Sequence, residues 1–212
     1  MSGVNSKVES ALVYVGDPMC SWCWGFAPVI DEVASARRLD IEIVVGGLRP
    51  GPSAQPLSER MEEFLRREWE MIHQRTGQPF DAGILTELGR SWSYDTEIPA
   101  RAVVAMRHQL PGEAWRFFGR LQNAFYAQRV DVTDTTAYEG LLDGFDVEPS
   151  LFIDRLGSDE LGQETWGDFT RARRWGITGF PTLLLRRGEH LHLLTAGYRP
   201  ADDVEAALGS LL

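Results

Sequence analysis

Cysteine is scarce in this chain: Cys20 and Cys23 are the only two among 212 residues. A small scaffold held together by several disulfides is therefore excluded. Long apolar runs are also missing, since no stretch approaches the roughly 18 to 20 apolar residues of a membrane span. The apolar run near the N-terminus has only about five residues, fewer than the core of a secretory signal requires. These absences predict a soluble cytoplasmic protein with no membrane partner.

The chain also has few positively charged residues relative to negatively charged ones. Lysine and arginine total 21 against 31 aspartates and glutamates, which gives a net charge of -10. Such a chain lacks the basic track that nucleic-acid binding requires, so nucleic acid is not expected as a partner. With 43% hydrophobic residues over its length, the chain has enough apolar material for one core with a large insertion or for two small domains.

Strand-like segments lie near both ends of the chain. Residues 11–15 and 41–45 are apolar runs, and residues 24–38 between them repeat apolar positions every three to four residues, as an amphipathic helix does. A strand, helix and strand this close together predict two parallel strands. Residues 182–186 and 190–195 predict a hairpin, followed by a helix over 200–211. This order predicts an α/β protein with the thioredoxin fold, a mixed four-stranded sheet flanked by helices.

The middle of the chain has helical periodicity and almost no strand pattern. The expected domains are a thioredoxin-like domain made of residues 1–55 plus 176–212 and an inserted all-helical domain over residues 56–175. Proline and glycine separate the helices expected in the insertion. Those helices are residues 59–76, 100–109, 113–128, 135–144 and 159–175.

The two cysteines lie where the first strand gives way to the first helix. Unpaired N–H groups at a helix start carry positive partial charge and stabilise a thiolate, which makes Cys20 the expected nucleophile. Cys23 lies three residues later, on the same face one turn along, and is expected to close a disulfide with Cys20 as the resolving thiol. The spacing therefore predicts dithiol–disulfide chemistry.

Chance proximity and metal binding account less well for the cysteine pair. Two core cysteines could lie close together by chance, but their position at a strand-to-helix junction argues against this. A zinc site normally has four ligands, and the sequence contains no second such pair. His190 and His192 alternate with Leu191 and Leu193 in the expected hairpin, so the histidines should point away from the core, toward solvent. No metal is expected.

A proline precedes the first strand of the expected hairpin. In the sequence Gly179-Phe180-Pro181-Thr182, the bond before Pro181 is the one type of peptide bond for which the cis form costs little. In a thioredoxin fold this loop lies against the cysteine pair, so a cis bond is expected at Phe180–Pro181. Trp22, Trp24 and Phe180 would then give the site an apolar rim suited to unfolded peptide.

Several blocks of sequence carry a family resemblance. They are residues 17–26 around both cysteines, residues 124–126 with 131–132, and residues 176–182, supported by residues 68–69 and 76–80. In these blocks the chain resembles the DsbA-like thioredoxin superfamily, and within it the cytoplasmic FrnE-like branch of protein disulfide isomerase-like enzymes. The resemblance implies a thioredoxin core interrupted by a helical domain, with Cys20, Cys23 and cis-Pro181 as the active-site residues.

The resemblance also implies a function. A thiol–disulfide oxidoreductase of this kind needs no cofactor and exchanges disulfides with protein or peptide substrates through a mixed disulfide on Cys20. Trp22, Phe180 and Thr182 would contact the substrate, and glutathione or the thioredoxin system would be the reductant. The chain departs from thioredoxins at Tyr14, where they place a buried acid six residues before the first cysteine.

Two further functions stay open at this point. One is a glutathione-dependent transferase or isomerase of the kappa type. The other is a non-catalytic peptide-binding module that keeps its dithiol as a redox sensor. Kappa-type enzymes usually have a serine at the position of Cys20 and need no second thiol, so the intact pair favours the oxidoreductase.

Overall fold

A four-stranded mixed sheet forms the centre of the molecule. In the computed structural model, which describes residues 10–212, the strand order is β2-β1-β5-β6. β1 pairs in parallel with β2 and antiparallel with β5, and β5 pairs antiparallel with β6. The expected parallel pair, the hairpin and the thioredoxin fold are therefore confirmed. The strands are β1 (Ser10–Gly16), β2 (Asp40–Val45), β5 (Thr182–Arg187) and β6 (His190–Ala196).

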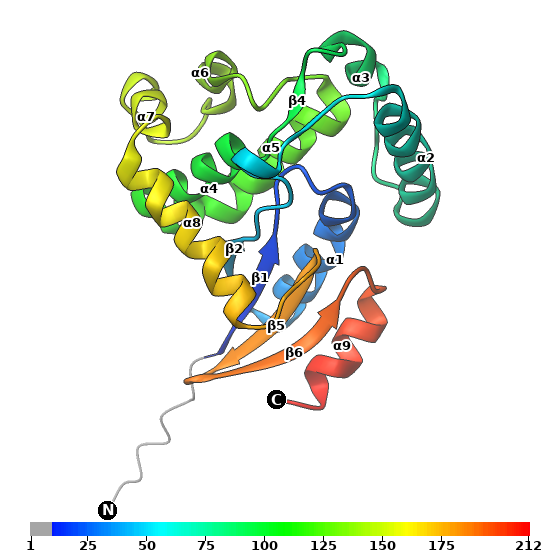
Figure 1. Cartoon of the computed structure of the whole chain (residues 1–212). Coiled ribbons are helices and arrows are strands. Elements are labelled where there is room, and N and C mark those ends of the chain that lie inside the picture. Colours follow the sequence, from blue (N-terminus) through cyan, green and yellow to red (C-terminus); the bar gives the residue numbers. More distant parts are fainter. Residues whose placement is uncertain (1–9) are drawn as a thin grey trace, which may run out of the picture.

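Helices cover both faces of this sheet (Figure 1). On one face lie α1 (Ser21–Arg37) and α9 (Ala201–Gly209), which bury their apolar stripes against alternate residues of β1 and β5 in the main core. On the other face α8 (Asp159–Arg174) contributes Ala172 to a smaller cluster with Val13, Val44 and Leu184. No helix in residues 10–212 is long and apolar enough to cross a bilayer.

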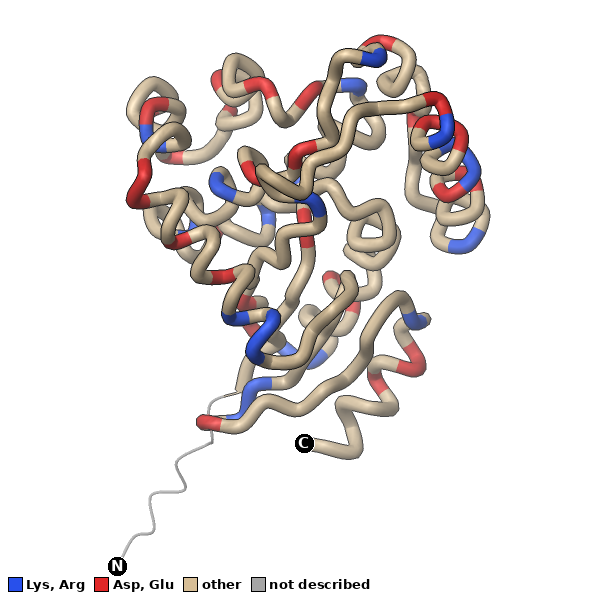
Figure 2. The backbone as a smooth tube through the Cα atoms, in the orientation of Figure 1, with Lys and Arg blue, Asp and Glu red and all other residues tan. Residues whose placement is uncertain are grey.

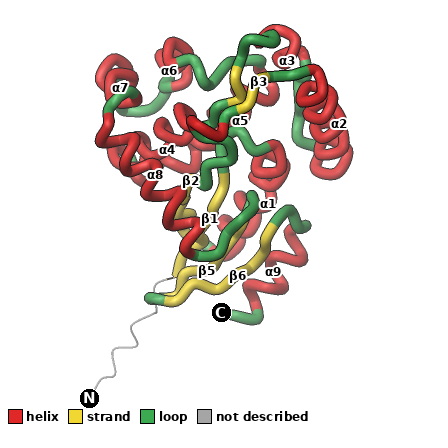
Figure 3. The backbone as a smooth tube through the Cα atoms, viewed as in Figure 1, coloured by secondary structure: helices red, strands yellow, loops and turns green. Residues whose placement is uncertain are grey.

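Apart from α8, most of the segment between β2 and β5 lies above the end of the sheet where β1 finishes and α1 begins (Figure 3). The same hydrophobic core continues from the sheet into this segment, with Leu12 and Trp69 as members. The division into two domains stays a prediction. Besides α8, the helices of the segment are α2 (Glu59–Thr76), α3 (Gly83–Leu88), α4 (Glu97–Gln109), α5 (Ala114–Gln128), α6 (Tyr138–Leu141) and α7 (Pro149–Leu156).

The segment differs from the sequence-based expectation in several places, and it contains two helices that were not expected, α3 and α7. It is not purely helical, because β3 (Gln55–Pro56) pairs with β4 (Ser93–Tyr94), and two residues are too few for a strand pattern. The helix expected over 135–144 is a 3₁₀ turn followed by the four residues of α6. The helix expected over 100–109 begins earlier, at Glu97, and includes Pro99 in its first turn. A proline is tolerated there because the N–H groups of the first turn have no partner within the helix.

The orientation of β6 corrects the face expected for its histidines, although His190 is exposed as expected. His192 pairs with Leu185, a residue of the main core, so the histidines lie on the α9 side, and His192 is partly buried. Leu193 pairs with Leu184 on the α8 side and is 61% exposed. The physical reason is that apolar clusters lie on both faces of the sheet, so alternation along β6 does not by itself tell which face is buried. On the α8 side the edge strand β6 is not covered by a helix, and Leu193 is therefore exposed.

Candidate active site

Cys20 occupies the N-cap position of α1 with extended backbone dihedrals, φ -91° and ψ 114°. Its N–H donates to the carbonyl of Asp17 over 3.0 Å and its carbonyl accepts the first helical bond, from the N–H of Trp24, at 3.1 Å. The turn therefore fixes the sulfur at the end of the helix where unpaired N–H groups concentrate. Cys20 is 6% exposed, whereas Cys23 is fully buried. This difference in access suits the two roles expected from the sequence.

The loop before β5 faces Cys20. The Phe180–Pro181 bond is cis, as the sequence predicts, and the Cys20 thiol donates to the Phe180 carbonyl over 3.7 Å. The Thr182 hydroxyl donates to the Gly179 carbonyl over 2.9 Å and is buried. Thr182 therefore holds the loop in shape, while its neighbour Phe180 presents backbone to the thiol.

The loop after β2 packs against the ring of Phe180. A Cβ added to Gly46 would lie 2.1 Å from the Phe180 ring, so the ring rests directly on this glycine. Gly47 has φ 73°, and a Cβ there would lie 2.8 Å from the Phe169 ring. Both glycines allow an approach that a side chain would block. The position of Phe180 thus depends on a segment about 130 residues earlier in the chain.

Cys23 lies in an apolar enclosure formed by β1 and α1. Burial raises the pKa of the Cys23 thiol, and the adjacent Cys20 raises it further. The Tyr14 hydroxyl donates to the Cys23 carbonyl over 3.4 Å. Burial also keeps the pKa of Tyr14 well above its usual value. Tyr14 therefore stays a phenol that donates hydrogen bonds, where thioredoxins have a carboxylate that can accept a proton.

Asp17 is a buried carboxylate that the sequence-based prediction missed. It is fully buried and accepts hydrogen bonds from the N–H of Met19 at 2.9 Å and of Leu48 at 2.7 Å. Burial raises the pKa of this carboxyl to about 6, although both N–H groups and the Arg49 charge oppose the shift. Asp17 joins the loop before Cys20 to the loop after β2. Its place directly after a buried strand is the one sequence signal that could have indicated it.

Replacing Asp17 with asparagine should change how stability depends on pH. Because the folded pKa of about 6 lies above the ordinary aspartate value of 3.8, the folded chain binds this proton more tightly than the unfolded chain. The stabilisation is complete below pH 3.8 and is lost as pH rises through 6. Between about pH 4 and 7 the unfolding free energy of the wild type should fall by up to about 3 kcal/mol relative to Asp17→Asn. Urea titrations of both proteins across this range measure it, and a pH-independent difference would contradict the assignment.

The helical segment forms the other wall of the site. The Tyr94 hydroxyl donates to the Met19 carbonyl, and the Trp24 indole donates to the Pro79 carbonyl over 2.9 Å. Arg75 lies over the Trp22 ring, 5.9 Å from its centroid. None of these long-range contacts has a signal in the sequence. They show that the start of α1 is held by the helical segment as well as by the sheet.

The expected aromatic rim is only partly present, because Trp24 is buried and Trp22 is the aromatic residue between the cysteines. Trp22 is partly buried and its ring centroid lies 5.9 Å from that of Tyr198, which follows β6. Arg75 also lies over Tyr198, 5.2 Å from the ring centroid. Of the residues expected to contact substrate, Trp22 lies on the first turn of α1 beside Cys20, and Phe180, whose carbonyl contacts the Cys20 thiol, lies in the loop before β5. Their substrate contacts stay a prediction, as does that of Thr182, whose side chain is buried.

Comparison with known proteins agrees with this geometry. No protein-family model and no curated protein matches the chain, but solved structures do. A "putative protein disulfide isomerase" from Nitrosomonas europaea is 34% identical, with 95% of this chain and 97% of that chain covered and a TM-score of 0.83. The cytosolic disulfide reductase DsbM from Pseudomonas aeruginosa is 27% identical, with coverage of 95% and 98% and a TM-score of 0.74. The DsbM structure with GSH is 26% identical, with the same coverage and a TM-score of 0.76.

The first of these relatives matches over nearly the full length of both chains, and its identity exceeds what fold similarity alone produces. The sheet order, the helical segment between β2 and β5 and the cysteine pair at the start of α1 all fit the same description. The chain belongs to the DsbA-like thioredoxin superfamily of thiol–disulfide oxidoreductases.

Proposed function

We propose that the protein exchanges its Cys20–Cys23 dithiol with disulfides of protein or peptide substrates. The observation that carries this proposal is the position of Cys20: its sulfur lies at the N-terminus of α1, 3.7 Å from the Phe180 carbonyl, with Cys23 one turn along. A strand that paired with the Phe180 backbone would bring its own sulfur toward Cys20. The partly buried Trp22 and Phe180 flank that approach.

The reaction proceeds in two displacement steps. The Cys20 thiolate attacks one sulfur of the substrate disulfide, which forms a mixed disulfide and releases the other substrate sulfur as a thiolate. The Cys23 thiol loses its proton and attacks Cys20, which forms the Cys20–Cys23 disulfide and releases the second substrate thiol. Because burial raises the pKa of Cys23, the second step requires a neighbouring group that favours the Cys23 thiolate. The adjacent Tyr14 hydroxyl acts in that direction, because it lowers the pKa of the Cys23 thiol.

An external dithiol or two monothiols must reduce the Cys20–Cys23 disulfide before the next turnover. We propose glutathione as this reductant, because a structural relative 26% identical to the chain is described with GSH. The thioredoxin system is the second candidate. The same relative is described as cytosolic, which supports a cytoplasmic location in a glutathione-rich compartment where disulfide reduction is favoured.

Insulin reduction with glutathione as the only reductant tests the proposal. The wild-type protein should catalyse the loss of insulin disulfides under these conditions, and the rate should depend on glutathione concentration. Conjugation of glutathione to 1-chloro-2,4-dinitrobenzene is the matched assay for a kappa-type transferase. Conjugation without any disulfide reduction would contradict the proposal. Peptide binding without turnover in either assay would instead identify a binding module.

A further inference from the structure

An apolar groove runs along the open face of the β5–β6 hairpin. It has a volume of about 580 Å³ and lies on the α8 side of the sheet. The charged residues of this hairpin lie at its turn, with Arg186 and Arg187 at the end of β5 and Glu189 in the turn itself, and the end of these strands nearer the cysteines has none (Figure 2). Its apolar lining residues are Trp175, Ile177, Phe180, Leu184, Leu191 and Leu193.

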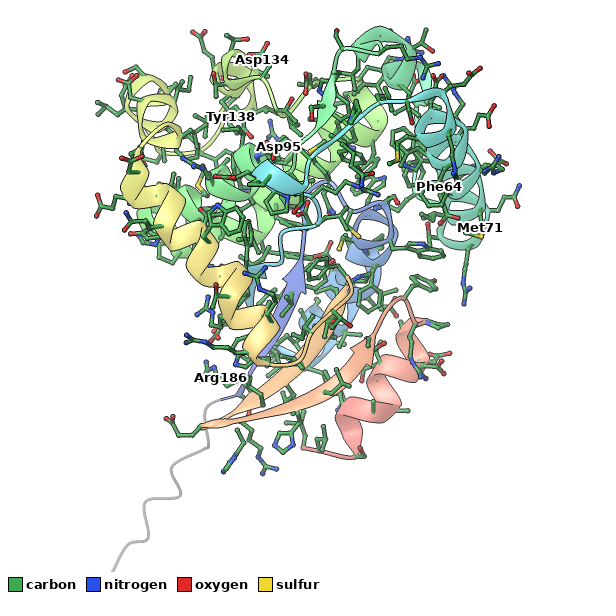
Figure 4. The ribbon with its side chains drawn as sticks, viewed as in Figure 1. Phe64, Met71, Asp95, Asp134, Tyr138 and Arg186 are labelled. Atoms are coloured by element: carbon green, nitrogen blue, oxygen red, sulfur yellow. The ribbon has the colours of Figure 1, made fainter. Side chains whose placement is uncertain are left out.

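The groove exists because the helix layer on this face stops short. α8 packs on β2, and its last turn brings Ala172 against Val13 and Val44 in the smaller cluster. β6 is the edge strand and receives no helix on this side. Leu193 is consequently 61% exposed and Trp175 37% exposed. The other exposed large apolar residues include Phe64 and Met71, which lie on α2, away from β6 (Figure 4).

Phe180 connects the groove to the thiol. Its carbonyl is the group that the Cys20 thiol contacts at 3.7 Å, and the same residue lines the groove. Within residues 10–212 the N–H of Phe180 has no hydrogen-bond partner, so it is free to pair with another backbone. An extended chain bonded here would pass directly from Cys20 onto the apolar surface.

We infer that this groove binds a large apolar side chain of an extended polypeptide whose cysteine forms the mixed disulfide with Cys20. The inference rests on the proposed function and specifies its substrate class. Burying these apolar lining residues against another apolar group removes them from water and lowers the free energy of the complex. Glutathione has no large apolar side chain, so the groove should discriminate unfolded protein from the small thiol.

Leu193→Ser tests the groove, and Leu151→Ser is the matched control. Leu151 is a similarly exposed leucine, at 67%, on α7. The substrates are a set of short peptides with one cysteine, activated as mixed disulfides with thionitrobenzoate. Each carries a single leucine at a different position beside the cysteine, and a reference peptide carries serine instead. Release of thionitrobenzoate gives kcat/KM.

For at least one leucine position, Leu193→Ser should lower kcat/KM by about tenfold. The reference peptide and glutathione mixed disulfide should be unaffected, as should every substrate with Leu151→Ser. Circular dichroism confirms that both variants are folded. Equal kinetics of Leu193→Ser and wild type on all peptides would overturn the inference while leaving the proposed function intact. A dimer that only Leu193→Ser dissociates would overturn it in favour of a second copy as the occupant. No turnover of any disulfide would overturn both.

Discussion

Cys20→Ser should lower the turnover of every disulfide substrate by at least about 10³-fold, because it removes the attacking sulfur. Cys23→Ser should behave differently. Cys20 is the more accessible of the two sulfurs, whereas Cys23 is fully buried, so only Cys20 can meet a substrate directly. In Cys23→Ser the first displacement still occurs, and the mixed disulfide then accumulates because no second thiol resolves it.

Mass spectrometry after incubation with an activated peptide disulfide distinguishes the two variants. Cys23→Ser should carry one covalently attached peptide that a reductant removes, and Cys20→Ser should carry none. Ser21→Ala is the matched control within the same turn, since it keeps both thiols, and it should retain most of the wild-type turnover. A peptide trapped on Cys23 in Cys20→Ser would reverse the roles assigned to the two cysteines.

The elements that the sequence predicts well are those whose pattern is local. The parallel pair and the hairpin appear within one or two residues of their expected bounds, because alternating or continuous apolar runs define each strand by itself. The sequence pattern does not predict α7, although Pro149 lies at its start, because eight residues give little periodicity. Leu193 shows a different limit: which face of β6 is covered depends on where α8 ends, and no residue of β6 carries that information.

The same distinction holds for the site. The cysteine pair is set by neighbouring residues, so its spacing predicts it, whereas the cis bond at Phe180–Pro181 is predicted only once that pair has indicated a thioredoxin fold. Asp17 is different, because its burial depends on Leu48, whose N–H it accepts. Tyr94 is even more distant in sequence from the residue it contacts, because its hydroxyl donates from the helical segment to the Met19 carbonyl. Contacts of this kind follow only from the three-dimensional packing of segments that the sequence places far apart.

Asp168→Ala should destabilise the fold by about 3–5 kcal/mol, since it removes one partner of a buried ion pair. Asp168 is 4% exposed and accepts hydrogen bonds from Arg107 at 2.6 Å, from Arg171 at 2.5 Å and from the N–H of Val45 at 3.1 Å. Its removal leaves the partly buried Arg107 guanidinium and a buried backbone N–H without this acceptor. Glu113→Ala, which breaks an exposed pair with Arg116, should cost less than about 1 kcal/mol.

Asp168→Ala should also lower turnover, because Asp168 accepts the N–H of Val45 and so fixes the end of β2. Val45 is followed by Gly46, on which the Phe180 ring rests, and by Leu48, which donates to Asp17. Releasing the Val45 N–H should therefore loosen both supports of the Cys20 site. Denaturant unfolding gives the stability change, and turnover measured where Asp168→Ala is still folded gives the second effect. Full turnover in the folded variant would show that the end of β2 does not position the site, whatever the change in stability.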